Sequence, residues 1–285
     1  MIGSLAEGGS EAVAGSPLVD LHLRSTVTAV REGWTSVVED DLAIEEPLEI
    51  RVDGLPFSVT MRTPGHDLEL AAGFLVSEGI VAARRELPVL EPVGVEGNVV
   101  AATIAGPGAV LARQRRRALY VSSSCGICGT ASIEAVTTLS AHAIAPHAMR
   151  VRRAVLAGLP DRLREEQRLF GATGGVHAAG LFSLDGDAIT VREDVGRHNA
   201  VDKVIGRALL DDRLPLADTL LQVSGRASFE LVQKARMAGI PLLAAVSAPS
   251  SLAVQLAEES GITLVGFSRG GGFNVYAHPE RIDLG

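Results

Sequence analysis

The stretch that decides the fold is residues 219–268, TLLQVSGRASFELVQKARMAGIPLLAAVSAPSSLAVQLAEESGITLVGFS. Three short apolar runs in it, TLLQVS, PLLAAVS and ITLVGFS, have the length and composition of buried strands. Two segments with helical spacing of apolar residues, SFELVQKARMAG and SSLAVQLAEESG, separate these runs. The alternation of strand and helix predicts parallel strands joined by right-handed crossovers. We therefore expect an α/β fold, α+β over the whole chain, with parallel strands in its C-terminal half.

The loops that follow these strands meet at one edge of such a sheet, where open α/β folds bind their ligands. They are SGRAS (224–228), SAPSS (247–251) and FSRGGGFNVY (267–276). Short side chains allow backbone N–H groups to approach phosphate oxygens, and Arg226 and Arg269 could grip those oxygens bidentately. SAPSS alone is more typical of an ordinary β–α loop, and no Walker A or GxGxxG motif is present. Taken together, the loops favour a phosphate-bearing ligand.

The region just upstream contains a predicted hairpin and a predicted helix. GGVHAAGLFSLDGDAITVRED predicts a hairpin closed at Asp185 and Gly186, and GRHNAVDKVIGRALL predicts a helix. His198 and Asp202 are four residues apart and could share one face of that helix, although a simple surface pair explains them equally well. His177 lies in an apolar strand, where a hydrogen-bonded core histidine is more common than a ligand.

The N-terminal half is predicted to form a smaller, β-rich domain with one helix. EPLEIRVDG and LPFSVTMR flank an Asp53-Gly54 turn, HDLELAAGFLVSEGI has helical spacing, and VLEPVGVEGNVVAATIA predicts strands around Glu96 and Gly97. The expected division is a flexible leader (1–20), the β-rich domain (21–112), a basic segment with a cysteine loop (113–130), and an α/β domain (131–285).

Composition limits the classes of function. The chain has 285 residues, of which 47% are hydrophobic and 4% aromatic, so the core must be built mainly from Val, Leu, Ile and Ala. The net charge of −8 and the pI near 5.4 argue against nonspecific nucleic-acid binding. The sequence has neither an apolar run of about eighteen residues nor a secretory signal. We expect a cytoplasmic protein with no membrane segment and no nucleic-acid partner.

Both cysteines of the chain, Cys125 and Cys128, lie in SSSCGICGT (122–130), one Cys-x-x-C flanked by glycines. A single close pair is more typical of catalysis, redox chemistry or metal binding than of a disulfide framework. We expect a short strand before the pair and a helix, TASIEAVTTLSAHA, after it. The helix dipole and a run of arginines would then favour the thiolate. These arginines are Arg113, Arg115, Arg116 and Arg117.

Three chemistries fit the cysteine pair and stay open on this reasoning. They are thiol–disulfide exchange, zinc binding, and nucleophilic sulfur chemistry in which a thiolate carries a sulfur atom as a persulfide. Zinc would need further ligands from histidines or from a second subunit, because two thiolates supply only half a tetrahedral set. A zinc deaminase is excluded because the sequence lacks the H-x-E followed by P-C-x-x-C that this chemistry needs.

Several segments together resemble the FdhD family of formate dehydrogenase accessory sulfurtransferases. They are SSSCGICGTAS, TGGVHAAGLF, REDVGRHNAVDKVIG, SGRASFELVQKA, SAPSSLAVQLAEESGITLVGFSR and FNVY, with DLELAAGFLVSEGI in the N-terminal half. The resemblance covers residues 45–276 in the same order. It implies a cytoplasmic homodimer whose C-terminal domain is similar to the cytidine-deaminase fold.

The resemblance also implies a function. The family takes sulfur from a cysteine desulfurase as a persulfide and delivers it to the molybdenum cofactor, as bis-molybdopterin guanine dinucleotide, for the formate dehydrogenase apoenzyme. Matched to the family motif, Cys125 carries the sulfur and Cys128 supports it, with no resident metal. Residues 131–285 would be the cofactor-binding domain, and a free guanine nucleotide could occupy the cofactor's place. The matching cofactor-binding residues are Phe267, Ser268, Arg269, Gly270, Gly271 and Gly272, assisted by Arg226.

Two alternatives to this function are kept. One is a dimeric zinc- or nucleotide-binding module without sulfur transfer, and the other is a thiol–disulfide reductase. The chain departs from expectation in its glycine triplet, which leaves Arg269 as the only charged side chain in 267–272.

Overall fold

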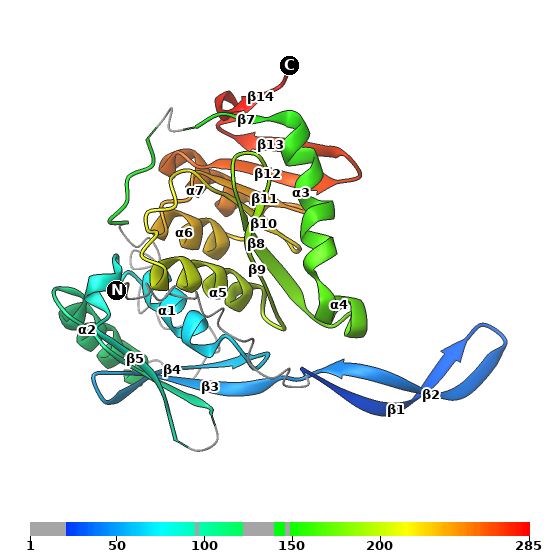
Figure 1. Cartoon of the computed structure of the whole chain (residues 1–285), viewed down its shortest axis with the longest axis horizontal. Helices are drawn as coiled ribbons and strands as arrows, with labels where there is room; N and C mark the ends of the chain where they lie inside the picture. Colours follow the sequence, from blue (N-terminus) through cyan, green and yellow to red (C-terminus); the bar gives the residue numbers. More distant parts are fainter. Residues whose placement is uncertain (1–20, 95–96, 122–139, 146–148) are drawn as a thin grey trace, which may run out of the picture.

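A computed structural model describes residues 21–94, 97–121, 140–145 and 149–285, and centres on a six-stranded mixed sheet (Figure 1). The strand order is β13-β12-β11-β10-β8-β9, in which β10, β11 and β12 are parallel and the other pairs are antiparallel. The strands are β8 (His177–Phe182), β9 (Ala188–Asp194), β10 (Leu220–Val223), β11 (Leu242–Ala245), β12 (Thr263–Arg269) and β13 (Gly272–Ala277). The predicted α/β class and its parallel strands are therefore confirmed.

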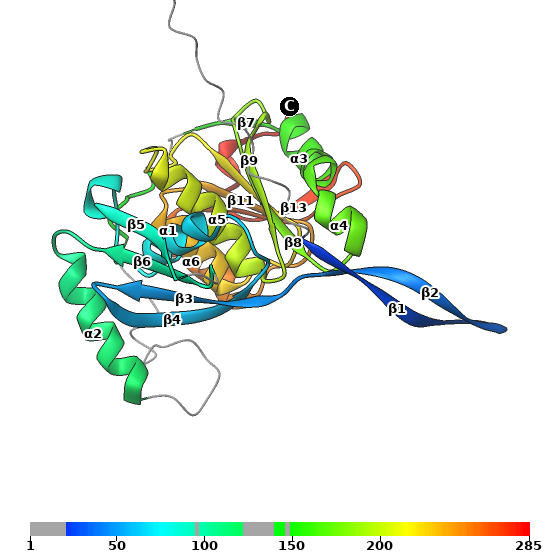
Figure 2. The same cartoon turned by 60° about the horizontal axis from the view of Figure 1, so that its bottom comes forward.

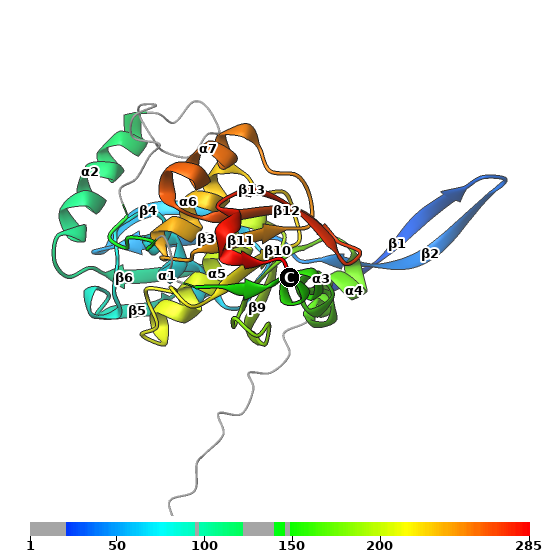
Figure 3. The same ribbon diagram turned by 90° about the horizontal axis from the view of Figure 1, so that it is seen from above.

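Helices cover both faces of this sheet (Figures 1 and 3). They are α5 (Arg197–Leu210), α6 (Phe229–Met237) and α7 (Ser251–Ser260) on one face, and α3 (Arg153–Glu166) and α4 (Arg168–Thr173) on the other. Leu221 and Leu243 belong to the core that includes α5, α6 and α7, whereas Leu220 and Leu242 belong to the core that includes α3. Because both faces are buried, the parallel strands are mostly apolar along their length and do not alternate apolar with polar residues.

The N-terminal part forms a second sheet, in the order β4-β3-β6-β5. Its strands are β3 (Glu46–Val52), β4 (Leu55–Arg62), β5 (Val89–Val93) and β6 (Val99–Thr103). The Asp53-Gly54 hairpin and the antiparallel pairing of β5 with β6 are as the sequence predicted. The remaining short elements are the 3-10 helices Arg84–Glu86 and Pro279–Arg281 and the paired strands β7 (Val151–Arg152) and β14 (Ile282–Asp283).

Helix α1 (Asp67–Ser77) joins the two parts of the molecule by packing on α5. The helices cross at two glycines, and a Cβ added at Gly206 would lie 1.8 Å from the carbonyl oxygen of Glu69. A Cβ at Gly73 would lie 1.8 Å from the carbonyl oxygen of Asp202. One apolar core therefore extends from Phe57 in the N-terminal sheet to Leu256 in α7.

Ion pairs reinforce this junction. Arg192 on β9 donates two hydrogen bonds, of 2.6 and 2.8 Å, to the Glu69 carboxylate on α1. Burial raises the pKa of Glu69, but hydrogen bonds from Arg192 and His66 outweigh burial and lower that pKa to about 2. Asp202 on α5 pairs with Lys234 on α6 at 2.7 Å and accepts a 2.6 Å hydrogen bond from Ser77 on α1.

Strands β1 (His22–Arg31) and β2 (Trp34–Ala43) form a two-stranded ribbon that projects away from the body (Figures 1 and 2). The register runs without interruption from Arg31 opposite Trp34 at the tip to His22 opposite Ala43 at the base. The base of the ribbon lies beside α4. The sequence predicted β structure here, but not a projecting arm.

One secondary-structure prediction is wrong. The segment before the cysteines was expected to be a basic stretch followed by a short strand, but it is one helix, α2 (Gly108–Val121). Leu, Ala, Gln and Arg are all strong helix formers, and they extend the helix through the apolar residues that were assigned to a strand. Cys125, Cys128 and most of the helix expected after them lie outside the described residues. Within the described part of the chain, no helix is long and apolar enough to cross a membrane.

Candidate functional site

The loops after β10, β11 and β12 lie side by side, as the sequence predicted. Ser247 N–H donates to Gly225 O at 3.2 Å, and Phe267 N–H donates to Ser247 O at 3.1 Å. Ala227 and Pro249 form a parallel bridge between the first two loops. We call this region, with the side chains described below, the strand-edge site.

The third loop differs from its expected form because residues 267–276 belong mostly to the hairpin of β12 and β13. Gly270 and Gly271 are its two turn residues and have φ of 60° and 75°, values that favour glycine. Arg269 pairs with Gly272 across this turn. The glycine triplet therefore has a structural reason that is independent of any ligand.

The side chains of this hairpin divide between the sheet and the surface. Ser268 is buried, and its hydroxyl lies 3.5 Å from Oε1 of Gln222 on β10. Phe267 is 37% exposed and adopts φ of 51°, an uncommon conformation for a bulky residue. The Arg269 guanidinium lies 5.6 Å from the Phe267 ring centroid. Arg269 and Phe267 thus present a cation and an aromatic ring together at the surface of the site.

A second group of side chains lies beside the first loop. A Cβ on Gly225 would lie 3.6 Å from Nδ1 of His177 and 3.9 Å from Cδ of Arg197, so these residues enclose Gly225. Burial lowers the pKa of His177, and the charges of Arg197 and His198 lower it further. The His177 ring is therefore neutral at pH 7 and able both to donate and to accept a hydrogen bond.

Two buried donors in this group have no hydrogen-bond partner among the described residues. They are Nε of Arg197, at the start of α5, and Oγ of Ser228, the N-cap residue of α6. Buried polar atoms are nearly always satisfied in native proteins, so unpartnered donors indicate a place for an acceptor. The positive end of the α6 dipole also favours an anion here.

A pocket of about 500 Å³ opens next to these residues, between the sheet and the α3–α4 pair. His177, Ser224 and Val246 line it from the sheet, and Phe170 lines it from α4. Arg164 lies 4.7 Å from the Phe170 ring centroid and also lines the pocket. An apolar pocket of this volume with a few polar groups is typical of a site for a heterocyclic ligand.

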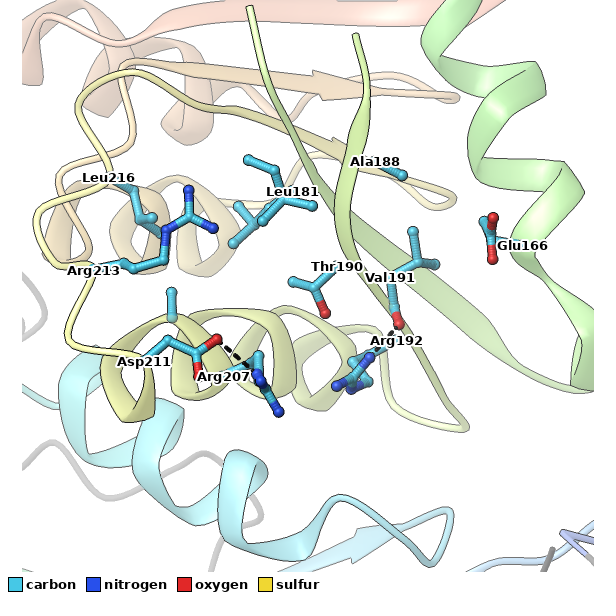
Figure 4. A pocket seen from close by; sticks show the side chains of 12 residues that line it. Glu166, Leu181, Ala188, Thr190, Val191, Arg192, Arg207, Asp211, Arg213 and Leu216 are labelled. Carbon is cyan, nitrogen blue, oxygen red and sulfur yellow. Dashed lines mark hydrogen bonds and ion pairs between the residues drawn. The ribbon is translucent and has the colours of Figure 1, made fainter. Parts of the chain in front are cut away.

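Another pocket, of about 400 Å³, lies at the open edge of β9, away from the strand-edge site (Figure 4). It is lined by Arg192, Arg207 and Arg213 among others. Arg192 is paired with Glu69, and Arg207 is paired with Asp211 at 2.8 Å. Two of its three cations are thus already neutralised, so this pocket is the weaker candidate for an anionic ligand.

The structure brings some predicted residues together and separates others. Arg226 is exposed on the first loop, in the strand-edge site. His198 forms a 2.6 Å ion pair with Glu230, whereas Asp202 is buried with Lys234, so the two residues form neither a joint site nor a surface pair. His177 is half-buried at the site rather than a core residue.

Comparison with known protein families assigns the chain to a family. The sequence profile of the FdhD/NarQ family matches residues 43–283. The chain belongs to the FdhD/NarQ family. The match includes the whole six-stranded sheet and every residue of the strand-edge site.

Relatives in this family are similar over nearly their full length. The sulfur carrier protein FdhD of Streptomyces coelicolor is 55% identical over 269 residues, which are 92% of this chain and 95% of that protein. The protein of the same name from Sulfolobus acidocaldarius is 43% identical over 258 residues, 90% of this chain and 97% of that protein. A crystal structure from Desulfotalea psychrophila, described as a proposed formate dehydrogenase accessory protein, has a TM-score of 0.74 at 26% identity and covers 92% of this chain and 100% of its own.

Reasoning from the sequence missed part of the site. Arg197 and Ser228 were not singled out, although both stand at helix starts that the sequence did predict. The pocket beside Phe170 was also missed because no element was predicted for residues 149–173. The GRHN motif could have indicated Arg197, because it begins helix α5 beside the loops of the strand-edge site.

Proposed function

We propose that this FdhD/NarQ protein is a sulfurtransferase that receives sulfur from a cysteine desulfurase as a persulfide on Cys125. It passes the sulfur to the molybdenum cofactor, as bis-molybdopterin guanine dinucleotide, which then enters formate dehydrogenase. The observation that carries the proposal is the strand-edge site, where three loops meet two unpartnered buried donors in a chain whose relatives are sulfur carriers.

The strand-edge site suits the guanine dinucleotide part of that substrate. The Ser228 hydroxyl, the Arg197 guanidinium and the N-terminus of α6 would hold its phosphates, with Arg226 and Arg269 reaching them from the surface. The pocket beside Phe170 has room for a guanine base. The Phe267 ring offers a second face for stacking. A free guanine nucleotide would use the same groups.

The first chemical step needs only a thiolate. The Cys125 thiolate attacks the outer sulfur of the desulfurase persulfide, so that a Cys125 persulfide forms and the desulfurase thiolate leaves. One S–S bond forms and one breaks, with no net oxidation. Cys128 then tunes the reactivity of its neighbour or assists release of the sulfur. We further propose that the protein works in the cytoplasm as a homodimer.

Intact-mass spectrometry tests the sulfur step. After incubation with an active cysteine desulfurase and L-cysteine, the wild-type protein is expected to gain one sulfur atom that a reducing agent removes, because only a persulfide behaves in this way. Cys125→Ala should show no adduct. Cys128→Ala should still show the sulfur adduct, because Cys128 supports the reaction and does not carry the sulfur.

Each alternative gives a different result in the same preparation. Stoichiometric zinc that is lost in Cys128→Ser, without any sulfur adduct, would indicate the zinc-binding module. Catalytic reduction of a small disulfide that requires both cysteines would indicate the reductase. Within the described ranges no group of three His, Cys, Asp or Glu side chains could hold a metal, but both cysteines lie outside those ranges.

Binding of GDP tests the strand-edge site separately. Arg226→Ala and Arg269→Ala are each expected to weaken GDP binding about tenfold, the effect of losing a hydrogen bond to a charged group. Arg213→Ala is the matched control, because Arg213 is an exposed arginine that lines the pocket at the β9 edge. Isothermal titration calorimetry measures all three. If only Arg213→Ala weakened GDP binding, the nucleotide site would be assigned to the pocket of Figure 4 and not to the strand-edge site.

A further inference from the structure

The projecting ribbon has two chemically different faces. On its polar face, Arg24 donates two hydrogen bonds of 3.1 and 3.3 Å to Asp41, and Thr26 donates one of 2.7 Å to Glu39. Side chains on the opposite face, which we call the apolar face, alternate with these along both strands. Its cross-strand pairs, from base to tip, are Leu23–Leu42, Ser25–Asp40, Val27–Val38, Ala29–Ser36 and Arg31–Trp34.

The apolar face is uncovered by the described residues. Leu23 is 63% exposed, Trp34 52%, Leu42 45% and Val38 39%, whereas the large apolar side chains exposed on the polar face are two valines near the tip, Val30 (67%) and Val37 (70%). A two-stranded ribbon is marginally stable in water unless a hydrophobic face packs on something else. Large exposed apolar side chains on one face mark an interaction surface, and a tryptophan is the commonest anchor of such surfaces. The ribbon is therefore an arm that needs a partner. The family match begins at residue 43, at the base of the arm.

The order of the pairs on the apolar face indicates which partner fits. Large apolar side chains occupy the first, third and fifth positions, the fifth being Trp34 opposite Arg31, and small or polar pairs occupy the second and fourth. A two-fold axis through the central Val27–Val38 pair places the Trp34 end of one arm over the Leu23–Leu42 end of another. Each Asp40 then faces the Ala29–Ser36 pair of the other arm, so no carboxylate faces a carboxylate.

Charge also fits this arrangement. Arg31 at the tip of one arm comes to lie near Asp40 of the second copy, one position from the base. On the apolar face these are the two charged residues, and they have opposite signs. The pattern is thus complementary to itself both in side-chain size and in charge, which is the requirement for a two-fold interface.

We propose that the apolar face of this arm packs against the same face of a second copy of the chain, with the two arms antiparallel about the Val27–Val38 pair. The inference rests on the homodimer of the proposed function and assigns its contact surface. It does not depend on sulfur transfer, so the dimer and the persulfide are measured separately.

Sedimentation equilibrium of the full chain tests this proposal with two variants one residue apart. Val38→Asp places two carboxylates against each other at the axis, and we expect the dimer dissociation constant to rise at least about 30-fold. Val37→Asp makes the same change on the polar face, where Val37 is 70% exposed, and should leave the dimer intact. Circular dichroism confirms that both variants keep the fold, since neither residue belongs to the core.

Trp34 gives an independent readout because it is the only tryptophan in the chain. Dilution of wild-type protein through the dissociation constant should shift its emission to longer wavelength, and Val38→Asp should show the shifted emission at every concentration. Three results would overturn the proposal: a monomeric wild type, a dimer that persists unchanged in Val38→Asp, or equal weakening by Val37→Asp. A monomer with a blue-shifted Trp34 would assign the face to the leader or another segment of the same chain.

Discussion

Gly206→Ala is expected to destabilise the protein by at least about 4 kcal/mol, and at 37 °C to leave most of it unfolded. The added Cβ would lie 1.8 Å from the Glu69 carbonyl oxygen and 2.7 Å from the Gly73 nitrogen, both of them backbone atoms of α1. Backbone atoms within a helix cannot move aside as a flexible side chain can, so α1 and α5 must separate. Their separation opens the apolar core that joins the N-terminal sheet to the central sheet.

Urea unfolding followed by circular dichroism measures this loss, and Gly158→Ala is its control. Gly158 also lies inside a helix, α3, but a Cβ there would meet nothing within 4 Å. That variant should be unchanged or up to about 1 kcal/mol more stable, because alanine is the better helix former. Equal effects at the two glycines would contradict the close crossing of α1 and α5.

Much of the fold could be predicted because its local signals agree with its tertiary packing. The three apolar runs are strands because they are buried on both faces, and the helices between them carry regular apolar stripes. The Asp53-Gly54 and Asp185-Gly186 turns fixed two hairpins for the same reason. In each hairpin, one short segment contains both the Asp-Gly turn and the strand-like pattern of apolar residues on either side of it.

The errors arise where a local signal fits two structures. The residues after the arginine run suit a short strand or the last turn of a helix, and continuity with α2 decides for the helix. The glycine triplet suits a ligand loop or a tight turn, and the antiparallel partner β13 decides for the turn. Such decisions depend on the elements that adjoin the segment and not on the segment's own residues.

The sequence predicted the sheet edge at which the site lies, but not the unpartnered hydrogen-bond donors within it. The three loops converge because parallel strands share an edge, which follows from topology alone. The unpartnered Arg197 and Ser228 could not be recognised, since an unpaired donor is a property of the packed structure. His177 shows the same limit, because its strand is apolar but its ring lies beside the loops.

Lys203→Met is expected to cost about 3–5 kcal/mol of folding free energy, because it leaves a buried carboxylate without its counter-charge. Nζ of Lys203 lies 2.7 Å from Oδ2 of Asp194, and the two side chains are 1% and 0% exposed. Lys203 also donates a 2.9 Å hydrogen bond to the carbonyl oxygen of Thr63, from the N-terminal part of the chain. Asp194 in turn accepts hydrogen bonds from the backbone of Gly196 at 2.8 Å and of Thr63 at 3.2 Å. The pair therefore fixes the start of α5, and with it Arg197, against the N-terminal half.

Two control variants test whether the expected loss of folding free energy is specific to the Lys203–Asp194 pair. Arg207→Met changes a cation one turn further along α5, but Arg207 is 49% exposed and pairs with Asp211 at the surface, so its loss should cost less than about 1 kcal/mol. Lys203→Met combined with Asp194→Asn removes the stranded charge and should be more stable than Lys203→Met alone, although both variants leave the Thr63 oxygen unpaired. Urea unfolding of all three variants measures their stability. GDP titration of the variants that remain folded reports whether Arg197 keeps its position in the strand-edge site. If Lys203→Met and Arg207→Met were equally mild, Asp194 would have to be satisfied by its backbone donors alone, and the start of α5 would not depend on the ion pair.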